Sequence, residues 1–152
     1  MLPTSGGGLL AGVAFAVKQL NPQVKIVGVE PETSNDTYLS LQSGEITPVI
    51  PNKSIAEGLL TTVGEINFEL IKQFVDEFVT VSEQEIAWTT IRLKRLGFKT
   101  ETSGAVSLAA CLFSKFAPHG RVLALLTGGN IDESKYEKLE EMTGSFFPDK
   151  LL

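Results

Sequence analysis

Hydrophobic and polar positions along the 152-residue chain follow two alternating periods. Apolar residues recur every three to four positions within residues 9–20, which predicts a helix that ends before Asn21 and Pro22. Residues 24–30 form a compact β-rich run, and a similar run returns at residues 77–81. Helix and strand patterns therefore alternate from the first residues onward.

Further helices are expected near residues 38–42 and over residues 66–74. Ser82 and Glu85 have the spacing of a capping box, in which the serine oxygen accepts from an early helical amide and the glutamate reaches back. The helix that they open is expected to end at Gly97, because glycine adopts the left-handed conformation that follows many helices.

The C-terminal third predicts a helix over residues 105–116, a strand over residues 121–126 and a last, charged helix over residues 133–142. The near-continuous apolar run in the strand favours a central position, buried on both faces. Strands separated by such helices indicate an α/β fold: a three-layer, mostly parallel sheet with flanking helices. Residues 1–152 are enough for a single domain and too few for two ordinary ones.

Composition narrows the function classes. With 43% apolar and 20% charged residues, the chain is globular in type. The net charge of −5 comes without a basic stripe, so nucleic acid is not an expected partner. The longest apolar stretch, residues 6–17, is too short to cross a bilayer, so no membrane partner is expected either. The single cysteine, Cys111, fits a reducing cytoplasm. His119 is expected in a surface loop, and the aromatic tail at residues 146–148 is expected to dock either on the domain or on a partner chain.

A glycine-rich loop at residues 5–8 leads directly into the first predicted helix. Consecutive glycines let the backbone turn its amides inward around an anion, and the helix N-terminus adds partial positive charge. The spacing matches neither a dinucleotide fingerprint nor a Walker loop. A flexible linker is the alternative, but a periodic helix follows the glycines at once. The loop therefore predicts a phosphate site.

Five segments of the chain together resemble one enzyme family. They are residues 5–12, 25–31, 54–58, 101–105 and 127–130, the last with the sequence Thr-Gly-Gly-Asn. In this order and at these intervals they are similar to the fold-type-II pyridoxal-phosphate enzymes of the threonine/serine dehydratase and serine racemase family. The resemblance implies a lyase that deaminates L-threonine or L-serine to a 2-oxo acid and ammonia, or a racemase. It also implies pyridoxal phosphate as the cofactor.

The resemblance assigns a role to each matching position. The glycine loop would hold the cofactor phosphate through backbone amides, and Gly58 would let the backbone pass close to the ring. Thr127 stands where the family usually has serine or cysteine, and its hydroxyl would face the pyridine nitrogen. A neutral alcohol would leave the pyridine nitrogen largely unprotonated, so the ring would be a weaker electron sink than one paired with a carboxylate, which suits elimination or racemisation. The residues expected to bind the cofactor are Ser5, Gly6, Gly7, Gly8, Leu9, Gly58, Glu101 and Thr127.

A second site is implied by the metal-dependent members of the family. Glu30 and Asp36 match their two acidic ligands, and Ser34 would supply a backbone carbonyl between them. Carboxylates, a carbonyl and waters suit Mg²⁺, Mn²⁺ or Ca²⁺.

In the family, the catalytic lysine that binds the cofactor as a Schiff base lies upstream of the glycine loop, and a small domain closes over the substrate. The chain has no segment that matches either one. The resemblance therefore implies a C-terminal segment with no catalytic residue of its own, which is expected to be inactive alone.

Three functions remain open from the sequence. The first is a dehydratase segment that acts on an amino-acid substrate once it is joined to its N-terminal half. The second is a non-catalytic module from a truncated or split gene that binds a phosphate-bearing ligand or assembles. The third is an unrelated nucleotide-binding domain. Because a truncated sheet exposes an edge, either self-association into a homo-oligomer or pairing with a complementary N-terminal half is expected.

Overall fold

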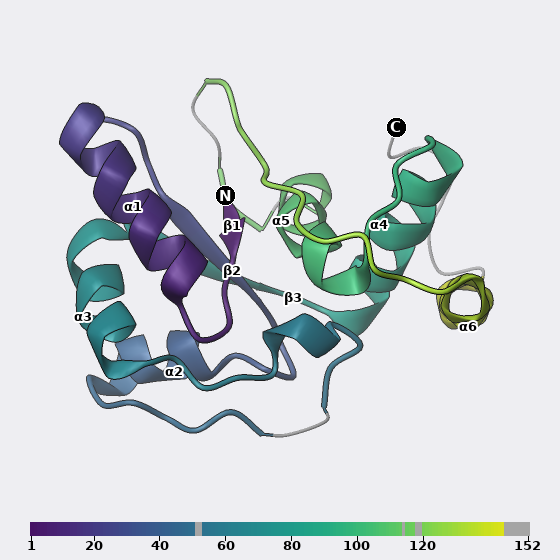
Figure 1. Cartoon of the computed structure of the whole chain (residues 1–152), viewed down its shortest axis with the longest axis horizontal. Helices are drawn as coiled ribbons and strands as arrows, with labels where there is room; N and C mark the ends of the chain where they lie inside the picture. The colour runs from purple at the N-terminus through teal and green to yellow at the C-terminus, as the bar shows by residue number, and fades with distance from the viewer. Residues whose placement is uncertain (51–52, 114, 118–119, 145–152) are drawn as a thin grey trace.

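A parallel sheet of three strands forms the centre of the computed structural model, with helices on both faces (Figure 1). The strands are β1 (Leu2–Pro3), β2 (Val27–Pro31) and β3 (Glu77–Val81), and β2 lies between the other two. Gly28 pairs with Leu2 on one side and with Phe78 on the other. The structure describes residues 1–50, 53–113, 115–117 and 120–144.

Helices α1 (Gly8–Leu20) and α3 (Glu65–Phe74) pack against each other and cover one face of the sheet. Their inward positions are apolar at helical spacing, so each helix buries one stripe. Leu10, Ala14 and Ile71 are fully buried in this layer. The glycine loop that opens α1 is therefore anchored to a packed face of the protein.

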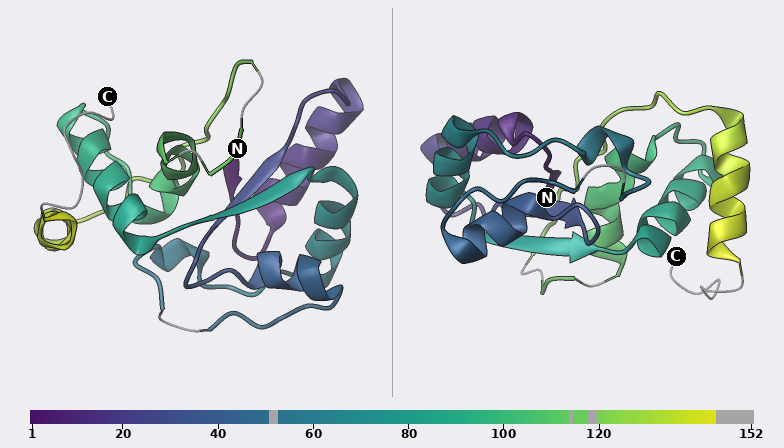
Figure 2. Two further views of the ribbon diagram at one scale, coloured as in Figure 1. Left: turned by 180° about the vertical axis from the view of Figure 1, so that it is seen from behind. Right: turned by 90° about the horizontal axis from the view of Figure 1, so that it is seen from below.

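Helix α5 (Thr102–Leu112) covers the opposite face and contacts all three strands. Helix α4 (Glu83–Arg95) packs on α5, and α6 (Glu133–Thr143) packs on the outer side of α4 (Figure 2). Alternate strand residues such as Val27 and Val29 point toward α5 and bury against its alanines. The order is thus helix layer, sheet, helix layer, as the sequence predicts.

Two short elements, α2 (Asp36–Ser43) and the 3₁₀ turn η1 (Glu57–Leu59), fall between β2 and α3. The bounds of β3 match the prediction, and both hydrogen bonds of the capping box are present. Gly97 has a φ of 85° just after α4, as expected for a left-handed helix end. Strand β2 begins three residues later than its apolar run, and α5 begins three residues earlier than expected.

The expected central strand over residues 121–126 is wrong. This segment has no strand structure; it lies beside β1, where the amide of Leu125 donates to the Met1 carbonyl at 3.1 Å and the Met1 amine donates to the Leu123 carbonyl at 2.7 Å. Leu123 is 79% exposed. Because β1 has only two residues, it offers too short a ladder to order the segment as a strand.

The expectations for His119 and for the tail at residues 146–148 lie outside the described residues. Within the described ranges, no helix combines the length and the apolar character needed to cross a membrane.

Substituting Gly28 by alanine should destabilise the protein. A Cβ atom at this position would lie 2.3 Å from Cε2 of Phe78, so the ring must leave its place in the core. We expect a loss of about 1–3 kcal/mol in the free energy of unfolding, measured by urea denaturation. Phe78→Leu in the same chain should recover part of that loss. Gly12→Ala is the control: no described atom lies within 4 Å of its added Cβ, and alanine in a helix should stabilise by roughly 1 kcal/mol. Equal behaviour of the two alanine variants would contradict the packing account.

Candidate active site

A cavity of about 260 Å³ opens beyond the C-terminal end of β1. Three separate parts of the chain line it: residues 3–10, residues 58–59 and Thr127. The structure thus brings together the glycine loop, Gly58 and Thr127. All but Glu101 of the residues expected to bind the cofactor lie around this cavity.

The glycine loop is fixed from behind by α3. The Asn67 side chain donates to the Gly6 carbonyl at 2.6 Å, and the Gly64 amide donates to the same oxygen at 3.2 Å. Gly7 has a φ of 86°, and a Cβ there would lie 2.9 Å from Cβ of Asn67. Glycine is therefore required at this position both by the backbone conformation and by the close packing.

The N-terminus of α1 points its free amides toward this cavity. No side chain caps the helix, and its first turn contains no acidic residue. The first amides of a helix have no partner within it and carry the positive end of the helix dipole. Residues 8–10 line the cavity, so this end of it can bind an anion through the backbone.

Ser5 and Thr4 contribute differently to the cavity. The Ser5 hydroxyl donates to the Thr61 carbonyl at 3.3 Å and accepts from the Thr61 amide at 3.1 Å, so its hydrogen-bonding capacity goes to the neighbouring loop. Thr4 is buried, and its hydroxyl has no partner within the described part of the chain. The unpartnered hydroxyl is a further polar group available to a ligand.

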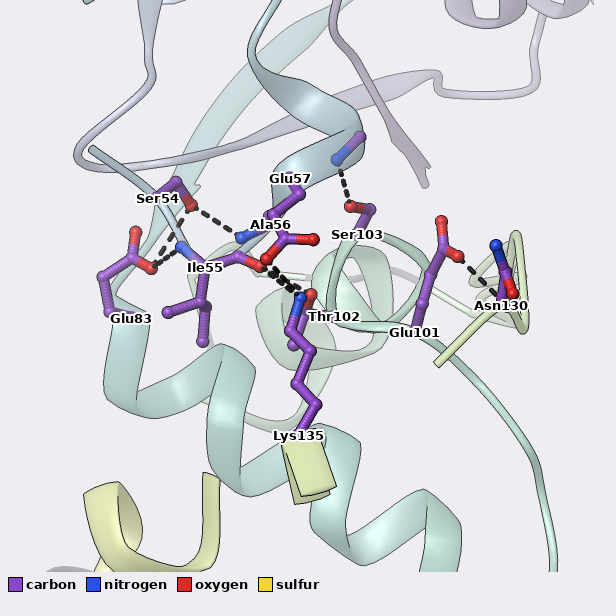
Figure 3. Close-up of polar contacts among 11 residues, drawn as sticks. Ser54, Ile55, Ala56, Glu57, Glu83, Glu101, Thr102, Ser103, Asn130 and Lys135 are labelled. Carbon is purple, nitrogen blue, oxygen red and sulfur yellow. Dashed lines mark hydrogen bonds and ion pairs between the residues drawn. The ribbon is translucent and has the colours of Figure 1, made fainter. Parts of the chain in front are cut away.

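Thr127 is placed by a direct contact with α5. A Cβ on Gly104 would lie 1.6 Å from the Thr127 carbonyl oxygen, so only a glycine allows the helix to come this close. Glu101 precedes α5, and its carboxylate accepts from the Asn130 amide at 3.2 Å (Figure 3). Glu101 does not line the cavity; it holds the loop that carries Thr127.

Glu30 is fully buried at the end of β2. Its carboxylate accepts from the amides of Thr37 at 3.1 Å and Tyr38 at 2.8 Å, in the first turn of α2. Burial raises the pKa of Glu30 to about 8; the hydrogen bonds from Thr37 and Tyr38 oppose this shift, and the negative charge of Asp36 adds to it. A nearby cation would relieve both the burial and the repulsion.

Asp36 is also buried, and burial raises its pKa while the hydrogen bond from the Val63 amide opposes the shift. One carboxylate oxygen accepts from Val63 at 3.0 Å; the other is buried with no partner among the described residues. This free oxygen fits a cation ligand. Over the same residues no group of three or more histidine, cysteine or acidic side chains could hold a metal, so carbonyls and waters would have to complete the shell.

Comparison with known proteins identifies the family to which the chain belongs. The model of the family "Pyridoxal-phosphate dependent enzyme" matches residues 1–128, which is most of the chain. The chain belongs to this family of pyridoxal-phosphate-dependent enzymes. Family membership sets aside the unrelated nucleotide-binding domain as an interpretation of the glycine loop.

Several relatives of this pyridoxal-phosphate family member are similar to it in sequence or in fold. The serine racemase of Dictyostelium discoideum is 42% identical over 144 residues, covering 90% of this chain and 44% of the relative. The L-threonine ammonia-lyase of Thermotoga maritima is 36% identical over 141 residues, covering 91% and 35%. The threonine deaminase isoform 2 of Solanum lycopersicum has a TM-score of 0.84 at 35% identity, covering 94% and 43%. The chain thus spans less than half the length of these relatives.

One end of the cavity fits the phosphate group of the family's cofactor. A phosphate needs several convergent donors and little side-chain bulk, and residues 6–8 with the open end of α1 supply both. Asn67, Thr4 and Gly104 also shape the cavity, and the sequence analysis gave none of them a role. No local pattern marks Asn67 or Gly104, because each acts through a contact with a distant segment, and the role of Thr4 depends on the burial of its unpartnered hydroxyl, which the sequence does not show.

Gly104→Ala should displace Thr127 from the cavity. Because the added methyl group meets a carbonyl oxygen of the backbone, either α5 or the loop must move. We expect a loss of about 1–3 kcal/mol in unfolding free energy and large shifts of the Gly128 and Gly129 amide resonances. Ser107→Ala, one turn along the same helix, is the control. It removes a buried hydroxyl without a described partner, so stability should hold or rise and those resonances should stay in place.

Proposed function

We propose that the protein containing this chain is a pyridoxal-phosphate-dependent ammonia-lyase or racemase acting on L-threonine or L-serine, and that this chain supplies the cofactor-holding half of its site. The observation that carries the proposal is that residues 5–8, Gly58 and Thr127 line one cavity at the open N-terminus of α1. The names of the relatives, serine racemase and L-threonine ammonia-lyase, support the substrate class.

The residues divide the proposed work between the two ends of the cavity. The backbone amides after Ser5 bind the phosphate, while Gly58 leaves room for the ring and the Thr127 hydroxyl bonds the ring nitrogen. When bound, pyridoxal phosphate withdraws electrons from the α-carbon of an amino acid. A neutral hydroxyl partner moderates that withdrawal, which favours elimination or racemisation.

Among the described residues, the cavity lining includes no lysine. The group that binds the cofactor covalently, and the residues that select the amino acid, therefore come from outside these lining segments. We propose a complementary N-terminal half or a second copy of the chain as the partner, and residues 1–152 as one domain of the assembled enzyme.

The same absence of lysine from the lining supports a second candidate, a non-catalytic module that binds a phosphate-bearing ligand or assembles with other chains. Ammonia release from L-threonine or L-serine, with added cofactor, separates the two candidates. A non-catalytic module would release no ammonia, whether alone or assembled with other chains.

A cytoplasmic location is also part of the proposal. Cys111 is a free thiol, half-buried and raised in pKa by that burial, with the Met1 amine opposing the shift. An unpaired, unreactive thiol suits a reducing compartment.

Gly8→Asp should weaken phosphate binding without unfolding the chain. The first turn of α1 has room for the side chain, and an acid there is favoured by the helix dipole, but its charge repels an anionic ligand. Binding is measured by calorimetry with pyridoxine 5′-phosphate, an alcohol that cannot form an imine with surface lysines. We expect at least a roughly ten-fold weaker Kd, equivalent to about 1.4 kcal/mol.

Gly12→Asp is the matched control, because it places the same charge one turn later in open space. Its affinity should stay near that of the unmodified chain. If the unmodified chain does not bind pyridoxine 5′-phosphate, or if both aspartate variants bind it equally, the proposed site is wrong.

We further propose that Glu30, the Ser34 carbonyl and Asp36 hold a divalent cation. Millimolar MgCl₂, MnCl₂ or CaCl₂ should raise the Tm, with a stabilisation of about 2.7 kcal/mol at roughly 100 times the Kd. Asp36→Asn should lose this response, because it keeps an acceptor for the Val63 amide but removes the charge. Glu32→Gln changes an exposed acid of the same loop and should retain the response. A Tm response that survives in the asparagine variant would rule the site out.

A further inference from the structure

Residues 54–58, called here the cavity segment, reach the cavity through Gly58 but have little structure of their own. Only the last two of these residues belong to η1. Side chains from three other elements therefore decide where the segment lies, and Figure 3 shows them on both sides of it. The strongest of these contacts comes from Glu83, which had no role in the sequence analysis.

Glu83 is the first residue of α4, far from the cavity along the chain. One of its carboxylate oxygens accepts from the Ile55 amide at 2.7 Å and from the Ser54 hydroxyl at 3.2 Å. The other oxygen accepts a short hydrogen bond from the Thr33 hydroxyl. A single half-buried carboxylate thus ties the cavity segment both to α4 and to the loop that follows β2.

The opposite side of the segment is held by weaker groups. The Ile55 carbonyl accepts from the Thr102 hydroxyl at 2.7 Å and from Lys135 at 3.4 Å. Lys135 also pairs with Glu57 at 2.9 Å, but Glu57 is 74% exposed, and such pairs contribute little. The Gly58 amide donates to Ser103 at 2.9 Å.

Charge and short bonds together distinguish Glu83 among these partners. Hydrogen bonds to an ionised acceptor are roughly twice as strong as those between neutral groups. An acid in the first turn of a helix is also favoured by the helix dipole. Lys135 is charged too, but it lies 3.4 Å from the Ile55 carbonyl and its ion pair is with the exposed Glu57, whereas Glu83 accepts at 2.7 Å from the Ile55 amide and also bonds Ser54 and Thr33. The peptide between Ser54 and Ile55 therefore takes its position chiefly from α4.

We infer that Glu83 is a positioning residue for the ring side of the cavity: it sets the distance of the Gly58 backbone from a bound pyridine ring without touching the ligand. The inference rests on the proposed function. Only the ring side of the cavity should depend on Glu83, because the glycine loop at the other end is fixed by Asn67. Loss of Glu83 should then harm ring binding and leave phosphate binding intact.

The test compares two ligands on four proteins. Pyridoxine 5′-phosphate contacts both ends of the cavity, whereas inorganic phosphate contacts only the glycine loop. Glu83→Ala should weaken pyridoxine 5′-phosphate about ten-fold relative to the unmodified chain and leave the Kd for phosphate unchanged. Glu83→Gln keeps one acceptor for the Ile55 amide and should recover most of the affinity.

Glu85→Ala is the control for stability. It lies in the same helical turn and removes one capping-box bond and the ion pair with Lys115, at a cost of about 1 kcal/mol. It makes no described contact with the cavity segment, so both affinities should stay unchanged. Equal effects of the two alanine variants on pyridoxine 5′-phosphate, or equal weakening of both ligands by Glu83→Ala, would overturn the inference.

Hydrogen exchange in the absence of ligand gives an independent answer. The Ile55 and Gly58 amides should exchange faster in Glu83→Ala, while the amides of residues 8–11 should not change. If the unmodified chain binds neither ligand, the proposed function fails, yet the exchange rates still decide whether Glu83 fixes the segment. Unchanged exchange at Ile55 in both Glu83 variants overturns the inference. If Glu83→Ala does not fold, Glu83→Gln takes its place. It keeps one acceptor but loses the charge, so the amides of residues 54–58 should still exchange faster than in the unmodified chain, while those of residues 8–11 should not change.

Discussion

The site depends on a close contact between two backbones. Helix α5 approaches the Thr127 carbonyl so closely that no side chain fits at Gly104. The same helix packs on all three strands through its alanines and Val106, so the sheet sets its position. Thr127 consequently faces the glycine loop at a distance that the core determines. Close-packed interiors transmit such constraints because they have little free volume to absorb a shift.

Much of this arrangement can be predicted from short-range patterns in the sequence. The 3.6-residue period predicts α1, and the Ser82 and Glu85 pair predicts the start of α4 because both partners of a capping box lie within one turn. The glycine loop can be recognised before a helix for the same reason. Signals of this kind need no knowledge of the rest of the fold.

Other features could not be predicted because they depend on distant partners. Residues 121–126 have the composition of a buried strand, but a strand forms only when a neighbour offers a ladder, and β1 offers two residues. Glu83 resembles any acid at a helix start, and its role appears only when residues 33 and 54–55 are brought to it. The hydrogen bond between the Asn130 amide and the Glu101 carboxylate has the same origin, because the two residues are far apart in the chain.

The anion-binding end of the cavity is built from main-chain groups, whereas the opposite end, at Gly58 and Thr127, depends on side chains such as Ser103 that hold its backbone in place. Every residue except proline has a backbone N–H, so substitutions can change the outer surface of the loop while the loop still binds an anion. The opposite end changes with every replacement at position 127 or in the segments beside it. Proteins that diverge from this fold should therefore vary most at the end of the cavity near Gly58 and Thr127, and they should keep the anion-binding loop.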